Sequence, residues 1–105
     1  MECENLEEVR SNINRIDNNI IKLIAERSDY VKQAAKFKKS ENGVKAPARI
    51  EVVIAKVRGK AAEYGADTDM VEALYRGMIS RFIGMEMSEF SRNNQSARRQ
   101  IKEEI

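Results

Sequence analysis

The chain has 105 residues, 19 Lys and Arg against 17 Asp and Glu, one cysteine and no histidine. This length allows one domain, and the lack of histidine excludes Ser–His–Asp, Cys–His and histidine-ligated metal catalysis. The net charge of +2 is too balanced to indicate a nucleic-acid binder. No apolar run approaches the roughly 20 residues of a membrane span. The acidic start and the lone Cys3 favour the cytoplasm.

The first predicted helix starts near Asn5, which can cap it together with Glu8. Apolar residues then recur at alternating steps of three and four, a helical seam made of Leu6, Val9, Ile13, Ile16, Ile20 and Leu23. The same rhythm continues through Arg27, Tyr30, Ala34 and Phe37. Gly43 is expected to stop this helix.

The length of this first helix predicts a dimer. About 34 residues at 1.5 Å rise make a rod of roughly 50 Å. A compact globule of this size has a radius of gyration of only about 13 Å, so the rod extends beyond any monomeric core. A second copy of the chain would cover its apolar seam, and we therefore expect an all-α, intertwined homodimer.

Two further helices are predicted, which makes three in total. One starts at Pro47 and ends at Gly65, and the next is capped by Asp67 or Thr68. The apolar stripe of the last helix runs to Phe90. We expect a helical domain over residues 1–90 and a polar, frayed tail over residues 91–105.

Arg27 occupies a seam position whose predecessors are apolar. The residues three and four positions away are Leu23, Ile24, Tyr30 and Val31, so its own helix offers no carboxylate partner. Lys38 lies eleven residues further on, which is three helical turns and nearly the same face, and Ala34 forms a small floor between the two cations. The pattern indicates a pocket for a small dianion, and an arginine paired across the dimer is the structural alternative.

Two other arginines are candidates for binding the anion, and one of them, Arg49, has no acidic residue three or four positions away. Arg10 lies about 25 Å of helix away from Arg27, so the two can share a ligand only across an antiparallel dimer. Arg49 follows Pro47 at a predicted helix start, where backbone amides attract anions. A plain surface role is the alternative for each.

Glu86 continues the apolar stripe of the last helix. Its neighbours three and four residues before are Ile83 and Phe82, and the helix offers no basic partner at that spacing. Such surroundings tend to raise the pKa of a carboxyl group, and a protonated Glu86 could donate a hydrogen bond. A half-exposed glutamate near a fraying helix end is the alternative.

Together these residues resemble the all-helical chorismate mutases, including the related isochorismate pyruvate lyases. The resemblance spans roughly residues 6–90. It rests on Ile13-Asn14-Arg15-Ile16-Asp17, Ala25-Glu26-Arg27, Lys36-Phe37-Lys38, Ala46-Pro47-Ala48-Arg49, Val71-Glu72-Ala73-Leu74-Tyr75 and Phe82-Ile83-Gly84-Met85-Glu86.

The resemblance implies an entwined dimer with two equivalent sites for a small dianion, chorismate or isochorismate, and no metal or cofactor. Arg27 and the partner chain's Arg10 would hold the two substrate carboxylates. Lys38 and Glu86 would hydrogen-bond the ether oxygen whose bond to carbon breaks, and Arg49 would support the anionic end of the site. The same resemblance implies that the lining includes Ala34, Ala46, Phe82 and Ile83.

Conversion of chorismate to prephenate is the main reaction that the resemblance implies. Typical mutases carry an acidic residue at the position of Ala46 and can carry a small hydroxylated residue at that of Phe82. Many bacterial members have glutamine where Glu86 stands, whereas fungal-type mutases have glutamate. Ala46 is closer to the lyase branch, which forms salicylate and pyruvate, and the sequence leaves both reactions open.

Two functions of other classes are alternatives. The chain could be a non-catalytic, dimeric regulatory module that kept the fold, although the joint presence of Arg10, Arg27, Lys38 and Arg49 argues against this. Nucleic-acid binding by the arginines of the tail is a weaker alternative, because the tail also carries two glutamates.

Overall fold

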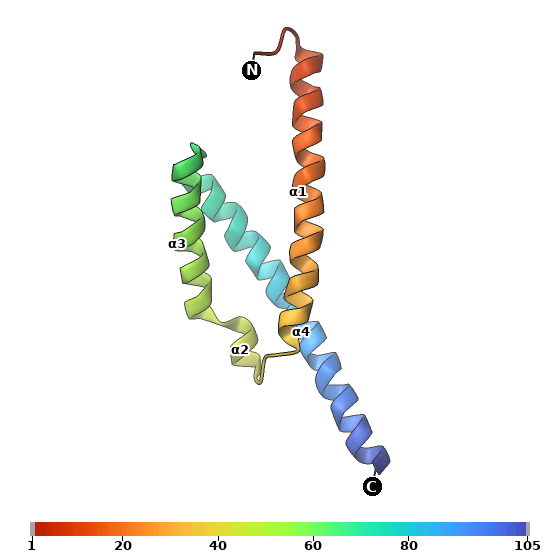
Figure 1. Cartoon of the computed structure of the whole chain (residues 1–105). Coiled ribbons are helices and arrows are strands. Elements are labelled where there is room, and N and C mark those ends of the chain that lie inside the picture. The colour runs from red at the N-terminus through yellow and green to blue at the C-terminus, as the bar shows by residue number, and fades with distance from the viewer. Residues whose placement is uncertain (1, 105) are drawn as a thin grey trace. The chain divides into compact units, whose positions relative to one another are not determined.

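The structure is a computed structural model that describes the backbone of residues 2–104 and the side chains of residues 2–94. All secondary structure in this range is α-helical, as Figure 1 shows, with α1 (Leu6–Ala35), α2 (Glu41–Lys45), α3 (Pro47–Tyr64) and α4 (Thr68–Glu104). The predicted all-α class with three long helices is confirmed, and α2 is a short addition. Over the described range, every helix is too short or too polar to cross a membrane. The chain forms two compact units, one up to Tyr30 and one from Val31 onward.

Helix α1 begins with the predicted cap. The backbone N–H of Glu8 donates to Oδ1 of Asn5 at 2.9 Å. In return, Oε2 of Glu8 accepts a hydrogen bond from the backbone N–H of Glu4 at 2.8 Å. The first bond satisfies a backbone donor that the first turn of a helix otherwise leaves without a partner, and the second joins the helix to the residue before its cap.

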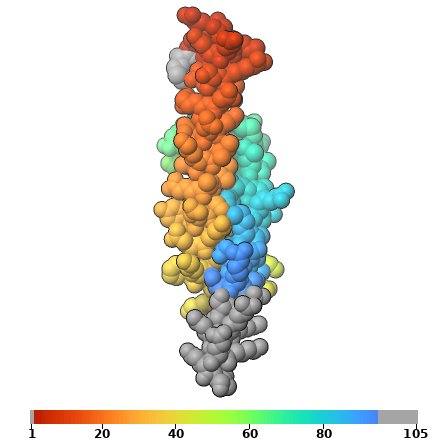
Figure 2. Space-filling model, turned by 90° about the vertical axis from the view of Figure 1, so that its right-hand side faces the viewer, coloured from red at the N-terminus to blue at the C-terminus, as the bar shows by residue number. Residues whose placement is uncertain are grey.

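The apolar seam of α1 lies at the surface of the single chain. Its members Leu6, Val9, Ile13, Ile16, Ile20 and Leu23 have exposed fractions between 39% and 63%. On the face shown in Figure 2, side chains of this first unit stand at the surface along its length. A row of large apolar residues in contact with water is unfavourable at about 25 cal/mol per Å², so the seam needs a covering surface.

The predicted end of the first helix is wrong. Helix α1 ends at Ala35, and the N–H groups of Lys36 and Phe37 close it with short-range bonds to the carbonyls of Gln33 and Ala34 at 3.1 and 3.0 Å. A second helix start at Ser40 follows directly. Its hydroxyl accepts a hydrogen bond from the N–H of Gly43, so this glycine lies inside α2 and does not stop α1.

The second unit is built around α3 and α4, which Figure 1 shows running in opposite directions from the turn that joins them. As predicted, Pro47 is the first residue of α3 and Gly65 ends it in the left-handed conformation at φ 75°. Asp67 then caps α4 by accepting hydrogen bonds from two backbone N–H groups at 3.0 Å. The buried apolar side chains of this unit are Ala35, Val44, Ile54, Ala61, Ile79, Phe82 and Phe90.

Helix α4 continues beyond the apolar stripe that predicts it. The stripe ends at Phe90, whereas the helical backbone runs to Glu104. After Gly84 the sequence contains neither glycine nor proline, so it offers no helix stop. The side chains beyond residue 94 lie outside the described part, and the boundary of the helical domain at residue 90 stays a prediction.

The junction between α2 and α3 is conformationally strained. Ala46 is the residue between the two helices and has φ 34° and ψ 62°, in the left-handed region. A Cβ atom is unfavourable there, and alanine offers no side-chain atom to cap the first amides of α3. Glycine or asparagine would fit this position better.

We expect Ala46→Gly to stabilise the protein. Relief of the left-handed strain and a better cap exceed the entropy lost to a more flexible unfolded chain, which leaves a gain of about 1 kcal/mol, or about 5 °C in Tm. Thermal unfolding followed by circular dichroism measures this shift. Ala73→Gly, at an exposed position inside α4, is the matched control and should lower Tm. A lower Tm for both variants would contradict the strain at Ala46.

Helices α3 and α4 are also joined by a network of ion pairs. The Arg76 guanidinium binds both carboxylate oxygens of Glu51 at 3.0 and 3.1 Å and Oε2 of Glu72 at 2.8 Å. Arg58 adds bonds to Glu72 at 2.7 Å and to Asp69 at 3.0 Å. Hydrogen bonds and charge from Arg76 lower the pKa of both Glu51 and Glu72 from the usual value of 4.5.

This network should make stability depend on pH below the ordinary glutamate range. Because the folded-state pKa values are lowered, its contribution is complete above pH 4.5 and is lost as the pH falls further. We expect Arg76→Gln to lower Tm modestly at pH 7, since the pairs are exposed. The difference from the wild type should shrink in acid. Arg81→Gln, an exposed arginine of α4, is the control, and a difference independent of pH would contradict the assignment.

Candidate active site

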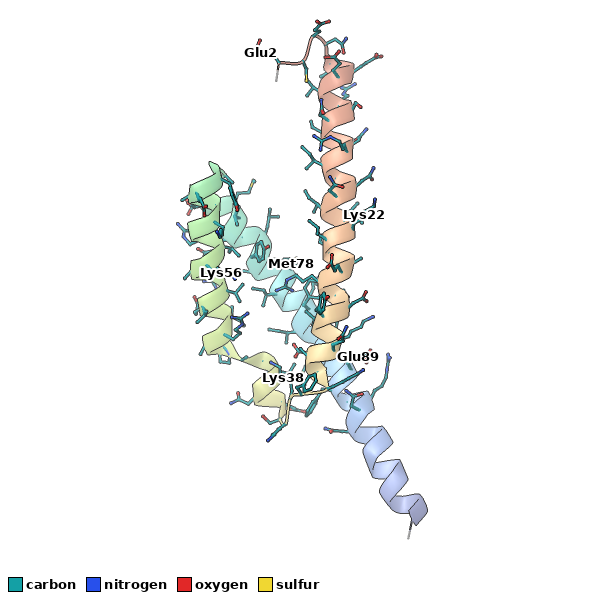
Figure 3. The ribbon with its side chains drawn as sticks, in the orientation of Figure 1. Glu2, Lys22, Lys38, Lys56, Met78 and Glu89 are labelled. Atoms are coloured by element: carbon teal, nitrogen blue, oxygen red, sulfur yellow. The ribbon has the colours of Figure 1, made fainter. Side chains whose placement is uncertain are left out.

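Lys38 lies between α1 and α2, where Figure 3 labels it, and its ammonium group reaches two elements. Nζ donates a hydrogen bond to the carbonyl oxygen of Gly43 in α2 at 3.2 Å. It also lies 3.7 Å from Oε1 of Glu86 in α4, and the lysine side chain is 30% exposed. The ammonium is thus held between α2 and α4 and remains accessible to a ligand from solution.

Glu86 is a buried polar residue in apolar surroundings. Its exposed fraction is 8%, and the buried rings of Phe82 and Phe90 lie one helical turn before and after it on α4. Its Oε1 has no hydrogen-bond partner among the described residues. The 3.7 Å between this oxygen and Nζ of Lys38 is too long for a direct hydrogen bond. An unsatisfied buried oxygen is costly, so this pair is suited to a polar ligand group that binds both side chains.

The start of α3 carries two further candidate residues. Ala46 is half-buried and precedes Pro47, and Arg49 is exposed in the first helical turn. The first turn of α3 contains no acidic residue, so the free amides and the Arg49 charge leave this helix end positive. An anion is therefore favoured at this end of α3.

A hollow of about 280 Å³ lies between α3 and α4. It is lined by Ile50, Arg76, Ile79, Ser80 and Ile83. Only Ile83 among these residues was predicted as a site residue. The Arg76 guanidinium already binds the carboxylates of Glu51 and Glu72, so the hollow offers mainly an apolar surface.

The sequence profile of the chorismate mutase type II family matches residues 9–87. The chain belongs to this family. It is also similar to an isochorismate pyruvate lyase from Pseudomonas aeruginosa, with 37% identity over 82 residues that cover 78% of this chain and 81% of the relative. The resemblance inferred from the sequence motifs is therefore confirmed.

The chorismate mutase profile covers every candidate site residue, from Arg10 to Glu86. The structure brings Lys38 and Glu86 together in the second unit, next to the buried ring of Phe82. Ala34 and Ile83 belong to the same unit and are half-buried. Arg10 and Arg27 belong to the first unit, and their joint action with Lys38 stays a prediction.

The helical argument that connected Lys38 to Arg27 is wrong. Lys38 lies three residues beyond the end of α1, so three further helical turns do not carry it to the face of Arg27. Its position is set by α2 instead, through the carbonyl of Gly43. The signal that could have revealed this is Ser40, a strong helix-capping residue followed by an acidic one.

Proposed function

We propose that this chorismate mutase family member cleaves the enolpyruvyl ether bond of a cyclic dianion by a pericyclic reaction. The observation that carries the proposal is the Lys38–Glu86 pair, with 3.7 Å between Nζ and Oε1 at a buried carboxyl group. Such a reaction needs no nucleophile and no acid–base side chain, which suits a chain without histidine. No metal or cofactor is expected to take part.

Lys38 and Glu86 supply the stabilisation of the transition state in this proposal. As the bond between carbon and the ether oxygen breaks, negative charge develops on that oxygen. The Lys38 ammonium stabilises the charge, and a protonated Glu86 donates a second hydrogen bond to the same oxygen. Donors fixed in place before the reaction act strongly because they need no rearrangement as the charge forms.

The remaining candidate residues bind and orient the substrate. Arg27 and the partner chain's Arg10 hold the two carboxylates, and Arg49 supports the anionic end. The lining is provided by Ala34, Ala46, Phe82 and Ile83. Holding a flexible dianion in its reactive conformation contributes several kcal/mol to catalysis.

The proposed assembly is a homodimer. The exposed seam of α1, with fractions between 39% and 63% along six apolar residues, supports burial against a second copy. Arg10 lies within this seam region and would enter the site of the partner chain. The predicted cytoplasmic location stays a prediction.

We propose isochorismate as the preferred substrate and chorismate as the second candidate. The similar Pseudomonas protein is an isochorismate pyruvate lyase, and Ala46 lacks the acidic side chain of typical mutases. In the lyase reaction the ether bond breaks while a ring hydrogen moves to the enolpyruvyl methylene group, giving salicylate and pyruvate. The family description supports the mutase reaction, in which that methylene group forms a bond to the ring and yields prephenate.

Separate assays with the two substrates test this proposal. Purified chain is given isochorismate and salicylate and pyruvate are measured, and it is given chorismate and prephenate is measured. We expect a higher kcat/KM for isochorismate. The reverse order would assign the mutase reaction. Activity with neither substrate would contradict the catalytic proposal and favour a non-catalytic helical module.

Glu86→Gln tests whether the carboxyl group acts as a hydrogen-bond donor. Glutamine has nearly the same shape and donates at every pH, whereas glutamate donates only when protonated. We expect wild-type kcat to decline with rising pH and the variant to lose this decline. Glu89→Gln, at a half-buried glutamate on the same helix, is the control. An identical pH profile for wild type and Glu86→Gln would contradict the role.

A further inference from the structure

The side chain of Lys38 is positioned by the short helix α2. It lies in a segment without regular hydrogen bonding, two residues before the capping residue of α2. Its Nζ has one hydrogen bond among the described residues, to the carbonyl of Gly43 at 3.2 Å. The position of that carbonyl therefore sets where the ammonium lies relative to Glu86.

The carbonyl belongs to a glycine, whose backbone is intrinsically the most flexible. Ser40 restricts this glycine through the N–H group of the glycine. The Ser40 hydroxyl accepts a hydrogen bond from the N–H of Gly43 at 3.1 Å, and the Ser40 carbonyl accepts one from the N–H of Val44 at 3.3 Å. Both groups of Gly43 are thus bound, one by Ser40 and one by Lys38.

Packing connects the same turn to α4. Val44 is 3% exposed and anchors the five-residue α2 in the core of the second unit. A Cβ atom placed on Gly43 would lie 3.5 Å from Oγ of Ser40 and 3.9 Å from Cδ of Lys38. The serine hydroxyl and the lysine stem therefore both lie near Gly43, with room for a methyl group at that position.

We infer that Ser40 is a positioning residue for Lys38. Its hydroxyl fixes Gly43, and the Gly43 carbonyl holds the Lys38 ammonium 3.7 Å from Oε1 of Glu86. The inference rests on the proposed role of Lys38 in the reaction. Ser40 is exposed and acts only through the turn that it caps.

Steady-state kinetics of Ser40→Ala and Ser40→Thr test the inference with the preferred substrate. Alanine removes the cap, and we expect kcat to fall about tenfold with a smaller change in KM, because a displaced cation weakens charge stabilisation in the transition state. Threonine restores the hydroxyl and should restore most of kcat. Ser88→Ala, which removes the exposed hydroxyl bond to Gly84 on α4, is the matched control and should leave kcat unchanged.

A measurement without substrate separates this inference from the proposed function. In Ser40→Ala, amide hydrogen exchange at Gly43 should become faster and the Lys38 side-chain 15N resonance should shift, whereas Ser40→Thr should retain the wild-type values. Wild-type kcat and an unshifted Lys38 resonance in Ser40→Ala would overturn the inference while leaving the catalytic proposal intact. An inactive wild type that still shows the Lys38 shift would contradict only the proposed function.

Discussion

Lys38→Ala should lower kcat/KM by about 100- to 1,000-fold, which is the usual cost of removing one preorganised donor from an active site. The variant removes the cation that lies 3.7 Å from Glu86 and leaves the buried carboxyl group without this partner. Most of the loss should appear in kcat, because in the proposed reaction the charge on the ether oxygen develops only in the transition state.

Two further variants test whether the loss of activity is specific to the Lys38 side chain. Lys39→Ala removes the neighbouring exposed lysine and should keep near-normal turnover. Lys38→Arg keeps a positive charge but changes its shape and reach, and it should remain well below wild type. Circular dichroism and Tm establish that each variant is folded. A Lys38→Ala protein with more than a third of wild-type kcat/KM would refute the assigned site.

Mixed dimers of two inactive variants should recover activity. In the proposed homodimer, Arg10→Ala and Lys38→Ala would each damage both sites. In a dimer formed from one chain of each, one site takes Lys38 from the first chain and Arg10 from the second, so that site is complete. Random exchange of chains gives half mixed dimers with one intact site each, and hence about a quarter of wild-type activity.

The control for this complementation pairs Arg27→Ala with Lys38→Ala. Both residues are proposed to serve the site of their own chain, so no mixed dimer contains an intact site and activity should stay low. The two proteins are unfolded together, refolded and assayed beside each parent alone. If the Arg10 and Lys38 variants regain nothing while a mixed dimer is seen by native mass spectrometry, Arg10 does not enter the partner's site.

Local signals in the sequence predicted most helix boundaries. Asn5 and Asp67 cap helices as expected, and Pro47 and Gly65 delimit α3, because these residues act on their own backbone or on that of the next few residues. The end of α1 was not predicted, because the apolar rhythm continues to Phe37 after the helical hydrogen bonds have ended at Ala35. Ser40 caps a new helix, α2, a few residues after this end.

The candidate site was predictable in part, from a polar residue that interrupts an apolar stripe. Glu86 stood out because it interrupts an apolar stripe, and the structure does bury it beside Phe82. The contact between Lys38 and Glu86 joins residues 48 positions apart, and helical periodicity carries no information on such pairs. Neither does it indicate Ser40 or the hollow beside Ser80, which depend on how α2, α3 and α4 pack.

The strained backbone at Ala46 bears on how this protein can change over time. Replacing Ala46 with glycine should raise the free energy of unfolding by about 1 kcal/mol. Since most substitutions cost about that much, an Ala46→Gly chain could carry one additional harmful change elsewhere and remain folded. Such a background is a suitable starting point for selecting new substrate preferences, because it widens the range of variants that survive the selection.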